Sequence, residues 1–192
     1  NRFNNKEVCV VHMRLLSWSV LILTLAVFAP AAQAETLWGK EFSNVNDWVI
    51  IYDPGSDSSI KSVDGLGALY VSAAKSEAAF GPDPKIETNF IPFDPAKASE
   101  YTISWKIDRR TNSVGWDIAI DEFSADKQFI NTVWNIYPAT GNCSDRGEFS
   151  KVLAERQWKP ETRYIMPKIN VHTGTGSQTV YLRYIKIDRT AK

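Results

Sequence analysis

The chain has 192 residues, with 22 basic and 22 acidic side chains, so its formal net charge is zero. Because it has no basic stripe interleaved with aromatic residues, nucleic acid is excluded as an expected partner. Its two cysteines and two histidines form no cluster at metal-ligand spacing, and no glycine-rich phosphate loop is present.

Residues 13–34, MRLLSWSVLILTLAVFAPAAQA, form the first distinctive segment. Arg14 supplies a positive start, residues 15–28 an apolar stretch, and Ala32-Gln33-Ala34 a small-x-small cleavage site, which is the pattern of a secretory signal peptide. A transmembrane helix is the alternative, but such a span needs about 20 apolar residues and Pro30 follows this shorter run. We therefore predict cleavage after Ala34, a secreted or periplasmic protein, and no membrane span after cleavage.

Residues 1–12 precede the start of this signal, and we interpret them as an upstream region or a wrongly assigned start. The mature chain, residues 35–192, then has 192 − 34 = 158 residues, which suits a single domain with a sizeable core. Cys143 is its single cysteine and cannot form an internal disulfide. We interpret it as a tolerated thiol in a turn-like loop rather than as a nucleophile.

Short strands separated by turn clusters such as Asp53-Pro54-Gly55-Ser56 follow the signal, and this pattern is typical of an all-β sandwich. The segment 148–157 is the one stretch that reads as a helix. The strands are predicted at 36–42, 47–52, 59–63, 68–73, 77–80, 85–90, 101–109, 115–123, 128–137, 163–172 and 179–188.

Alternation along a strand assigns successive side chains to opposite faces of a sheet. The predicted core face of four strands carries Tyr101, Ile103, Trp105 and Ile107; Trp116, Ile118 and Ile120; Ile130, Trp134 and Ile136; and Ile165, Ile169 and Val171. The opposite face is predicted to carry the ligand-binding candidates Asp117, Asp121, Asn131, Asn135, Tyr137, Tyr164, Lys168 and Asn170, with Phe123 and His172 beside them.

The residue types on this outer face point to a sugar ligand. Sugar hydroxyls hydrogen-bond well to carboxylates and amides, and the apolar face of a pyranose lies well on an aromatic ring. A plain solvated surface is the alternative, because the four strands need not be neighbours in space.

Three segments carry a family resemblance: the spacing from Phe42 to Trp48, the run Ile86-Glu87-Thr88-Asn89-Phe90-Ile91-Pro92-Phe93-Asp94-Pro95, and the strand Glu100-Tyr101-Thr102-Ile103-Ser104-Trp105-Lys106-Ile107. With them, the chain resembles the jelly-roll carbohydrate-binding modules that have a galactose-binding-like fold. The resemblance covers almost all of 35–188. It implies a jelly-roll β-sandwich of two antiparallel sheets that binds a polysaccharide or glycan as a monomer, without catalysis.

The resemblance also implies a possible structural calcium, which takes six to eight oxygen ligands. Glu41 matches the acidic residue of the first strand in that family. Arg183 stands where the family often has Asp, so Asp188 is the substitute ligand. No other cofactor is expected.

Catalytic carboxylates are the remaining question. Asp117 and Asp121 are four residues apart on one strand face, about 13 Å along it, whereas glycosidase pairs lie about 5–9.5 Å apart. We therefore predict a binding function rather than an enzyme. A structural or adhesion β-sandwich with a protein partner, or a diverged polysaccharide lyase or glycoside hydrolase, stays open as the alternative.

Overall fold

The computed structural model describes residues 33–42, 45–53, 58–72, 77–110, 115–138, 146–173 and 176–190. Cys143, residues 1–12 and nearly all of the predicted signal peptide lie outside these ranges, so the interpretations of these segments stay predictions. Within the described ranges, no helix is long and apolar enough to cross a membrane.

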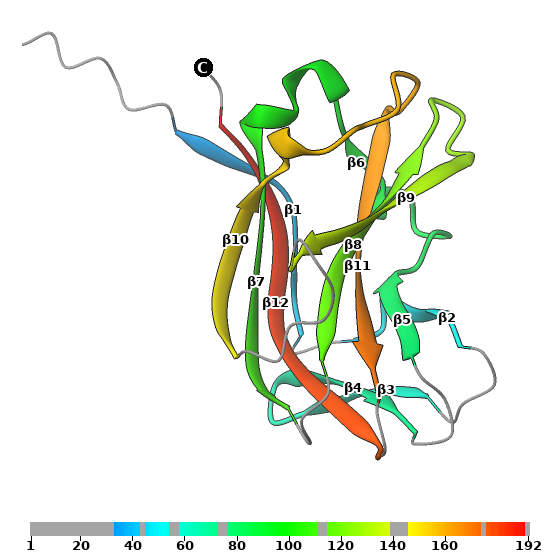
Figure 1. The fold of residues 1–192 in the computed structure, drawn as a ribbon, viewed down its shortest axis with the longest axis vertical. Helices are drawn as coiled ribbons and strands as arrows, with labels where there is room; N and C mark the ends of the chain where they lie inside the picture. The colour runs from blue at the N-terminus through cyan, green and yellow to red at the C-terminus, as the bar shows by residue number, and fades with distance from the viewer. Residues whose placement is uncertain are drawn as a thin grey trace, which may run out of the picture. The chain divides into compact units, whose positions relative to one another are not determined.

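Two antiparallel sheets form a jelly-roll β-sandwich, as predicted (Figure 1). In the first, which we call the β12 sheet, the order is β10 (Gly147–Val152), β7 (Tyr101–Arg110), β12 (Gln178–Thr190), β4 (Leu66–Val71) and β3 (Ser59–Val63), with β1 (Ala34–Glu41) also on β12. In the second, the β11 sheet, the order is β2 (Trp48–Tyr52), β5 (Glu77–Pro82), β11 (Tyr164–His172), β8 (Trp116–Phe123) and β9 (Phe129–Tyr137), with β6 (Ile91–Pro92) also on β11.

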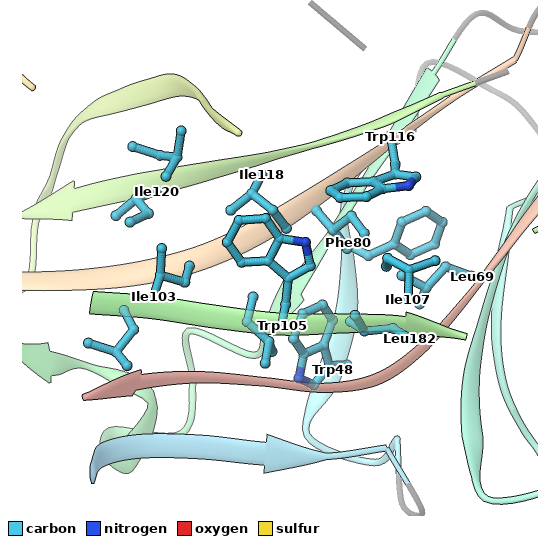
Figure 2. Close-up of a cluster of buried hydrophobic side chains, with 14 of the residues drawn as sticks. Trp48, Leu69, Phe80, Ile103, Trp105, Ile107, Trp116, Ile118, Ile120 and Leu182 are labelled. Atoms are coloured by element: carbon cyan, nitrogen blue, oxygen red, sulfur yellow. The ribbon is translucent and has the colours of Figure 1, made fainter. Parts of the chain in front are cut away.

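The core lies between these sheets and is built from the alternate residues that point inward (Figure 2). Trp105 on β7 and Trp116 on β8 meet edge to face, with ring centroids 6.1 Å apart. Leu69 on β4 and Phe80 on β5 are fully buried in the same cluster. Since burying one large apolar side chain contributes about 1.5–3 kcal/mol, such residues are the main source of stability.

The predicted inward residues of β7, β8 and β11 are confirmed by their burial. Two predicted elements are wrong. Segment 85–90 contains a short 3₁₀ helix, Glu87–Asn89, instead of a strand. Segment 148–157 begins as strand β10 and continues as a 3₁₀ turn, Leu153–Glu155, because its exposed and half-buried residues alternate with the period of a strand and pair with β7.

Over its middle, strand β9 has the opposite phase from the one predicted. Val133 pairs with the inward Ile120 and Tyr137 with the inward Ile118, and Trp134 is exposed. The predicted inward position of Ile136 is confirmed by its burial, and Phe129 at the start of the strand is exposed. Its sequence has apolar residues in both phases, so alternation alone could not choose between them. A register shift around Asn135, whose φ is +52°, also interrupts the strand.

Candidate functional site

A groove of about 530 Å³ lies on the outer face of the β11 sheet. It runs across the sheet from the edge strand β2 to the edge strand β9, over β5, β11 and β8 between them. The residues that line it are Ile51, Tyr52, Glu77, Ala78, Ala79, Asp121, Phe129, Thr132, Trp134, Lys168 and Asn170.

Small residues in the central strands make this face hollow. Ala79 on β5 pairs with Asn170, and Ala119 on β8 pairs with Lys168, so the direct cross-strand partner of each polar residue is small. A Cβ atom at Gly81 would lie 2.4 Å from Ile51 Cδ1. The absence of that atom lets Ile51 lean in from β2 toward the stem of Lys168.

Large apolar side chains form the two walls. On β2, Ile51 and Tyr52 are 41% and 52% exposed, and on β9, Phe129 and Trp134 are 61% and 55% exposed. Exposure of this kind is unusual for residues whose burial would contribute so much free energy, and rings gathered on opposite sides of a hollow indicate a binding surface.

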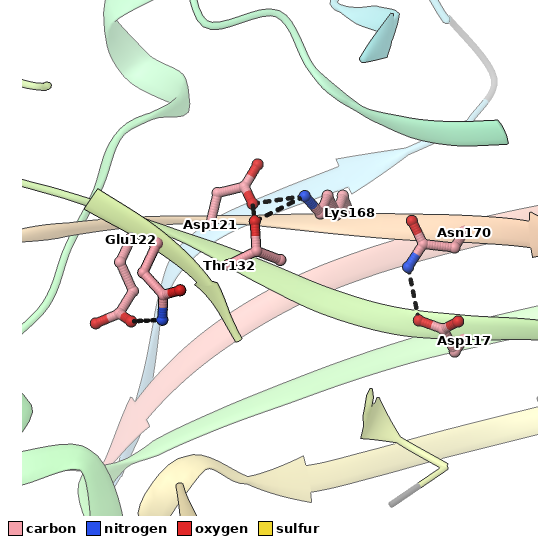
Figure 3. Close-up of polar contacts among 7 residues, drawn as sticks. Asp117, Asp121, Glu122, Thr132, Lys168 and Asn170 are labelled. Carbon is pink, nitrogen blue, oxygen red and sulfur yellow. Dashed lines mark hydrogen bonds and ion pairs between the residues drawn. The ribbon is translucent and has the colours of Figure 1, made fainter. Parts of the chain in front are cut away.

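The floor of the groove contains a buried ion pair (Figure 3). Lys168 Nζ lies 2.6 Å from Asp121 Oδ1 and 3.1 Å from Thr132 Oγ1, and the Thr132 hydroxyl donates to the same carboxylate oxygen at 2.6 Å. Lys168 Nζ also lies 4.7 Å from the centroid of the Trp134 ring, a cation–π contact. The buried charge therefore holds one wall of the groove in place.

A second polar group continues along the floor. Asn170 Nδ2 donates to Asp117 Oδ1 at 2.7 Å (Figure 3), and the other oxygen of Asp117 contacts His172 Nε2. His172 Nδ1 lies 3.3 Å from Glu77 Oε2 on β5. These contacts link β5, β11 and β8 side by side and fix the positions of the groove's acceptors.

The structure brings together part of the predicted ligand-binding set. Asp121, Lys168 and Asn170 line the groove, and Asp117, beside the lining, accepts a hydrogen bond from Asn170. Tyr164 lies on the same face but outside the groove lining, with its ring 6.0 Å from that of Phe90.

The remaining candidates do not reach the groove. The prediction that Tyr137 faces outward is wrong: its ring packs against Trp105 and Trp116, at centroid distances of 5.1 Å and 5.9 Å. Asn131 donates to Glu122 Oε1, on the inward phase of both strands, so its outward assignment is also wrong. Asn135 occupies the irregular turn of β9, where its backbone carbonyl accepts a hydrogen bond from Arg156.

Sequence reasoning did not identify the walls of the groove. Tyr52 and Ile51 belong to an edge strand that is apolar at every position, WVIIY, so period-two alternation gave no outward residue there. The predicted phase of β9 placed Trp134 in the core, and Phe129, which that phase leaves outside, was not singled out. The sequence did contain one signal for these walls, namely strands that are apolar at nearly every position. When such a strand has a single buried face, the apolar residues on its other face must be exposed.

The two predicted calcium ligands are far apart. Glu41 pairs with Tyr184, and Asp188 pairs with Thr36, so they lie at opposite ends of β1, about 17 Å apart along the strand. Asp188 accepts a hydrogen bond from Thr36 and forms an ion pair with Lys186. Glu41 and Asp188 thus do not fit one shared ion, and within the described ranges no group of three or more His, Cys, Asp or Glu side chains is placed to hold a metal.

No protein-family model matches the chain, and no curated protein matches it. Several solved structures match the chain at low sequence identity. The agarase AgWH50C superposes with a TM-score of 0.48 at 10% identity over 83% of this chain. The CBM22-1 xylan-binding domain of Xyn10C from Paenibacillus barcinonensis superposes with a TM-score of 0.43 at 9% sequence identity, over 84% of this chain and 99% of that domain.

The enzymatically active domain of tailspike protein 4 from bacteriophage CBA120 gives a TM-score of 0.42 at 12% identity over 75% of this chain. The chain spans 20% of the tailspike chain and 25% of the agarase chain. At such identities the likeness concerns the fold alone. The jelly-roll β-sandwich is established by the two antiparallel sheets of the chain itself.

Proposed function

We propose that this chain is an exported polysaccharide-binding module that binds a glycan in the groove of the β11 sheet. The observation that carries the proposal is the arrangement of exposed rings on opposite walls, Tyr52 and Trp134, above a floor of fixed polar groups. Export rests on the signal-like segment 13–34.

This arrangement matches the two chemical faces of a sugar ring. The C–H face of a pyranose packs on an aromatic ring, and its hydroxyls hydrogen-bond to groups such as Asp121 and Asn170. The groove is open to water, so each hydrogen bond replaces one that the free sugar already makes. We therefore expect modest affinity, with Kd in the range of about 1 µM to 1 mM.

Removing a wall ring should weaken binding without unfolding the protein. Tyr52→Ala and Trp134→Ala should each weaken retardation by a bound polysaccharide in affinity electrophoresis by about tenfold or more, since stacking contributes roughly 1–3 kcal/mol in comparable aromatic contacts. Both side chains are more than half exposed, so the melting temperature should change little.

Val152→Ala is the matched control, because Val152 is a 45% exposed apolar residue on β10 of the other sheet. It should leave retardation unchanged. Equal loss in all three variants, or retardation that survives both wall substitutions, would contradict a glycan site in this groove.

The alternatives give different results in the same assays. A protein-binding sandwich would show no retardation by any polysaccharide in the panel. A lyase would release an unsaturated product that absorbs in the ultraviolet, and a hydrolase would release reducing ends. The fixed polar floor favours the glycan, because a surface that docks an apolar protein patch gains nothing from buried carboxylates.

A further inference from the structure

On the groove floor, most hydrogen-bond donors are already paired within the protein, whereas several acceptors are not. Lys168 directs its ammonium hydrogens at Asp121, Thr132 and the face of the Trp134 ring. An ammonium group has no further donor after these contacts. Its charge is compensated by a buried carboxylate, so neither the charge nor a donor is left for a ligand.

The imidazole of His172 is used in the same way. His172 has a carboxylate at each ring nitrogen, Asp117 at Nε2 and Glu77 at Nδ1. Asn170 Nδ2 donates one of its two hydrogens to Asp117. Among the described residues of the floor, Lys168 and Thr132 have thus used their donors, and Asn170 keeps one N–H.

Acceptors, by contrast, remain. Within the described ranges, Asp121 Oδ2, Asn170 Oδ1 and Glu77 Oε1 have no hydrogen-bond partner, and all belong to residues that line the groove. Figure 3 shows the unpaired oxygens of Asp121 and Asn170 directed away from the atoms that hold these side chains.

We infer that the groove selects uncharged polysaccharides and rejects those that carry uronate or sulfate groups; this inference rests on the proposed function. A neutral sugar hydroxyl is a donor and satisfies these acceptors. An ionised carboxylate or sulfate has no proton to donate and would face Asp121 and Glu77. The lining carries the carboxylates Asp121 and Glu77 against Lys168. Asp117 and His172, which lie beside the lining, add one carboxylate and at most one cation, so the balance is not positive.

The test uses pairs of polysaccharides that share a backbone and differ in charge. Suitable pairs are hydroxyethyl cellulose with carboxymethyl cellulose, and methyl-esterified with de-esterified homogalacturonan. Binding to residues 35–192 is followed by tryptophan fluorescence at constant ionic strength, because Trp134 lies in the groove. We expect the neutral member of at least one pair to bind about tenfold or more tightly than its charged counterpart.

The outcomes separate the two proposals. Binding of the charged member as tight as, or tighter than, that of the neutral member would overturn the inference and leave glycan binding standing. Binding to neither member of any pair would overturn the proposed function, and the inference with it.

Asp121→Asn is the diagnostic variant, because it keeps the shape of the side chain and leaves the charge of Lys168 uncompensated. It should bind the charged members about tenfold more tightly than the unmodified protein does. Since it disturbs a buried pair, Glu77→Gln is the second variant. The Glu77 side chain is 42% exposed, and its replacement removes one groove charge with less effect on the fold.

Glu161→Gln is the matched control, with the same change in net charge at an exposed position outside the groove lining. It should leave the preference for neutral chains unchanged. If Glu161→Gln raises binding of charged chains as much as Glu77→Gln does, the selectivity comes from the net charge of the protein, and the inference is wrong.

Discussion

At the scale of single residues, Lys168 contributes both to the stability of the fold and to the proposed binding site. Its side chain is 7% exposed and that of Asp121 is 10% exposed, so the pair has been moved almost entirely out of water. Breaking such a pair by removing one partner costs more than the pair contributes, because the remaining charge is buried alone. The cation also supports Trp134, a ring that binding requires in our proposal.

Lys168→Met should therefore lower the free energy of unfolding by about 3 kcal/mol, measured by urea denaturation, because Asp121 is left uncompensated. The double variant Lys168→Met/Asp121→Leu should recover most of this loss. Lys186→Met is the matched control: its ion pair with Asp188 is 2.8 Å long, but the lysine side chain is 41% exposed, so the loss should stay below about 1 kcal/mol. Equal losses in the two lysine variants would show that burial of the pair has no energetic role.

At the scale of elements, β4 depends on a close approach between strand and core. A Cβ atom at Gly67 would lie 2.4 Å from Cδ1 of Phe42, a fully buried ring that follows β1. Phe42 also packs edge to face on Trp48, at a centroid distance of 4.6 Å, so the ring cannot simply move aside. The contact sets how closely β1 and β4 lie beside the common partner β12.

Gly67→Ala should destabilise the sandwich by about 1–3 kcal/mol, the usual cost of overpacking a core. Gly39→Ala on β1 is the control, because its Cβ would meet Lys186 Cβ at 3.3 Å and needs only a small adjustment. Thermal unfolding of both variants checks this expectation. If Gly39→Ala lowers the melting temperature as much as Gly67→Ala does, the close approach to Phe42 is not the cause.

At the scale of the whole molecule, the sequence predicted the sandwich better than the groove. Strands such as β7 alternate cleanly between Trp105 and its polar neighbours, and most turns are marked by Gly, Pro or Asp, so the layers follow from local patterns. The predicted polar residues Asp121 and Asn170 were found in this way.

The groove is a property of several strands together. Its depth depends on Ala79 and Gly81 lying on one side of β11 and Ala119 on the other, and they do so only because the strand order is β5-β11-β8. Nothing in the sequence near Ala79 indicates that Ala119 is close. The position of Trp134 depends likewise on the register shift at Asn135, which period-two alternation cannot represent.

Because the groove crosses the sheet from β2 to β9, a bound glycan would contact both edge strands at once and should stabilise the native state as a whole. A neutral polysaccharide that binds, supplied at about 100 times its Kd, should add about 2.7 kcal/mol through mass action. For a domain of this size that corresponds to a rise in melting temperature of roughly 5–10 °C. Trp134→Ala should lose the rise while keeping the melting temperature of the free protein, and a rise that persists in this variant would place the ligand elsewhere.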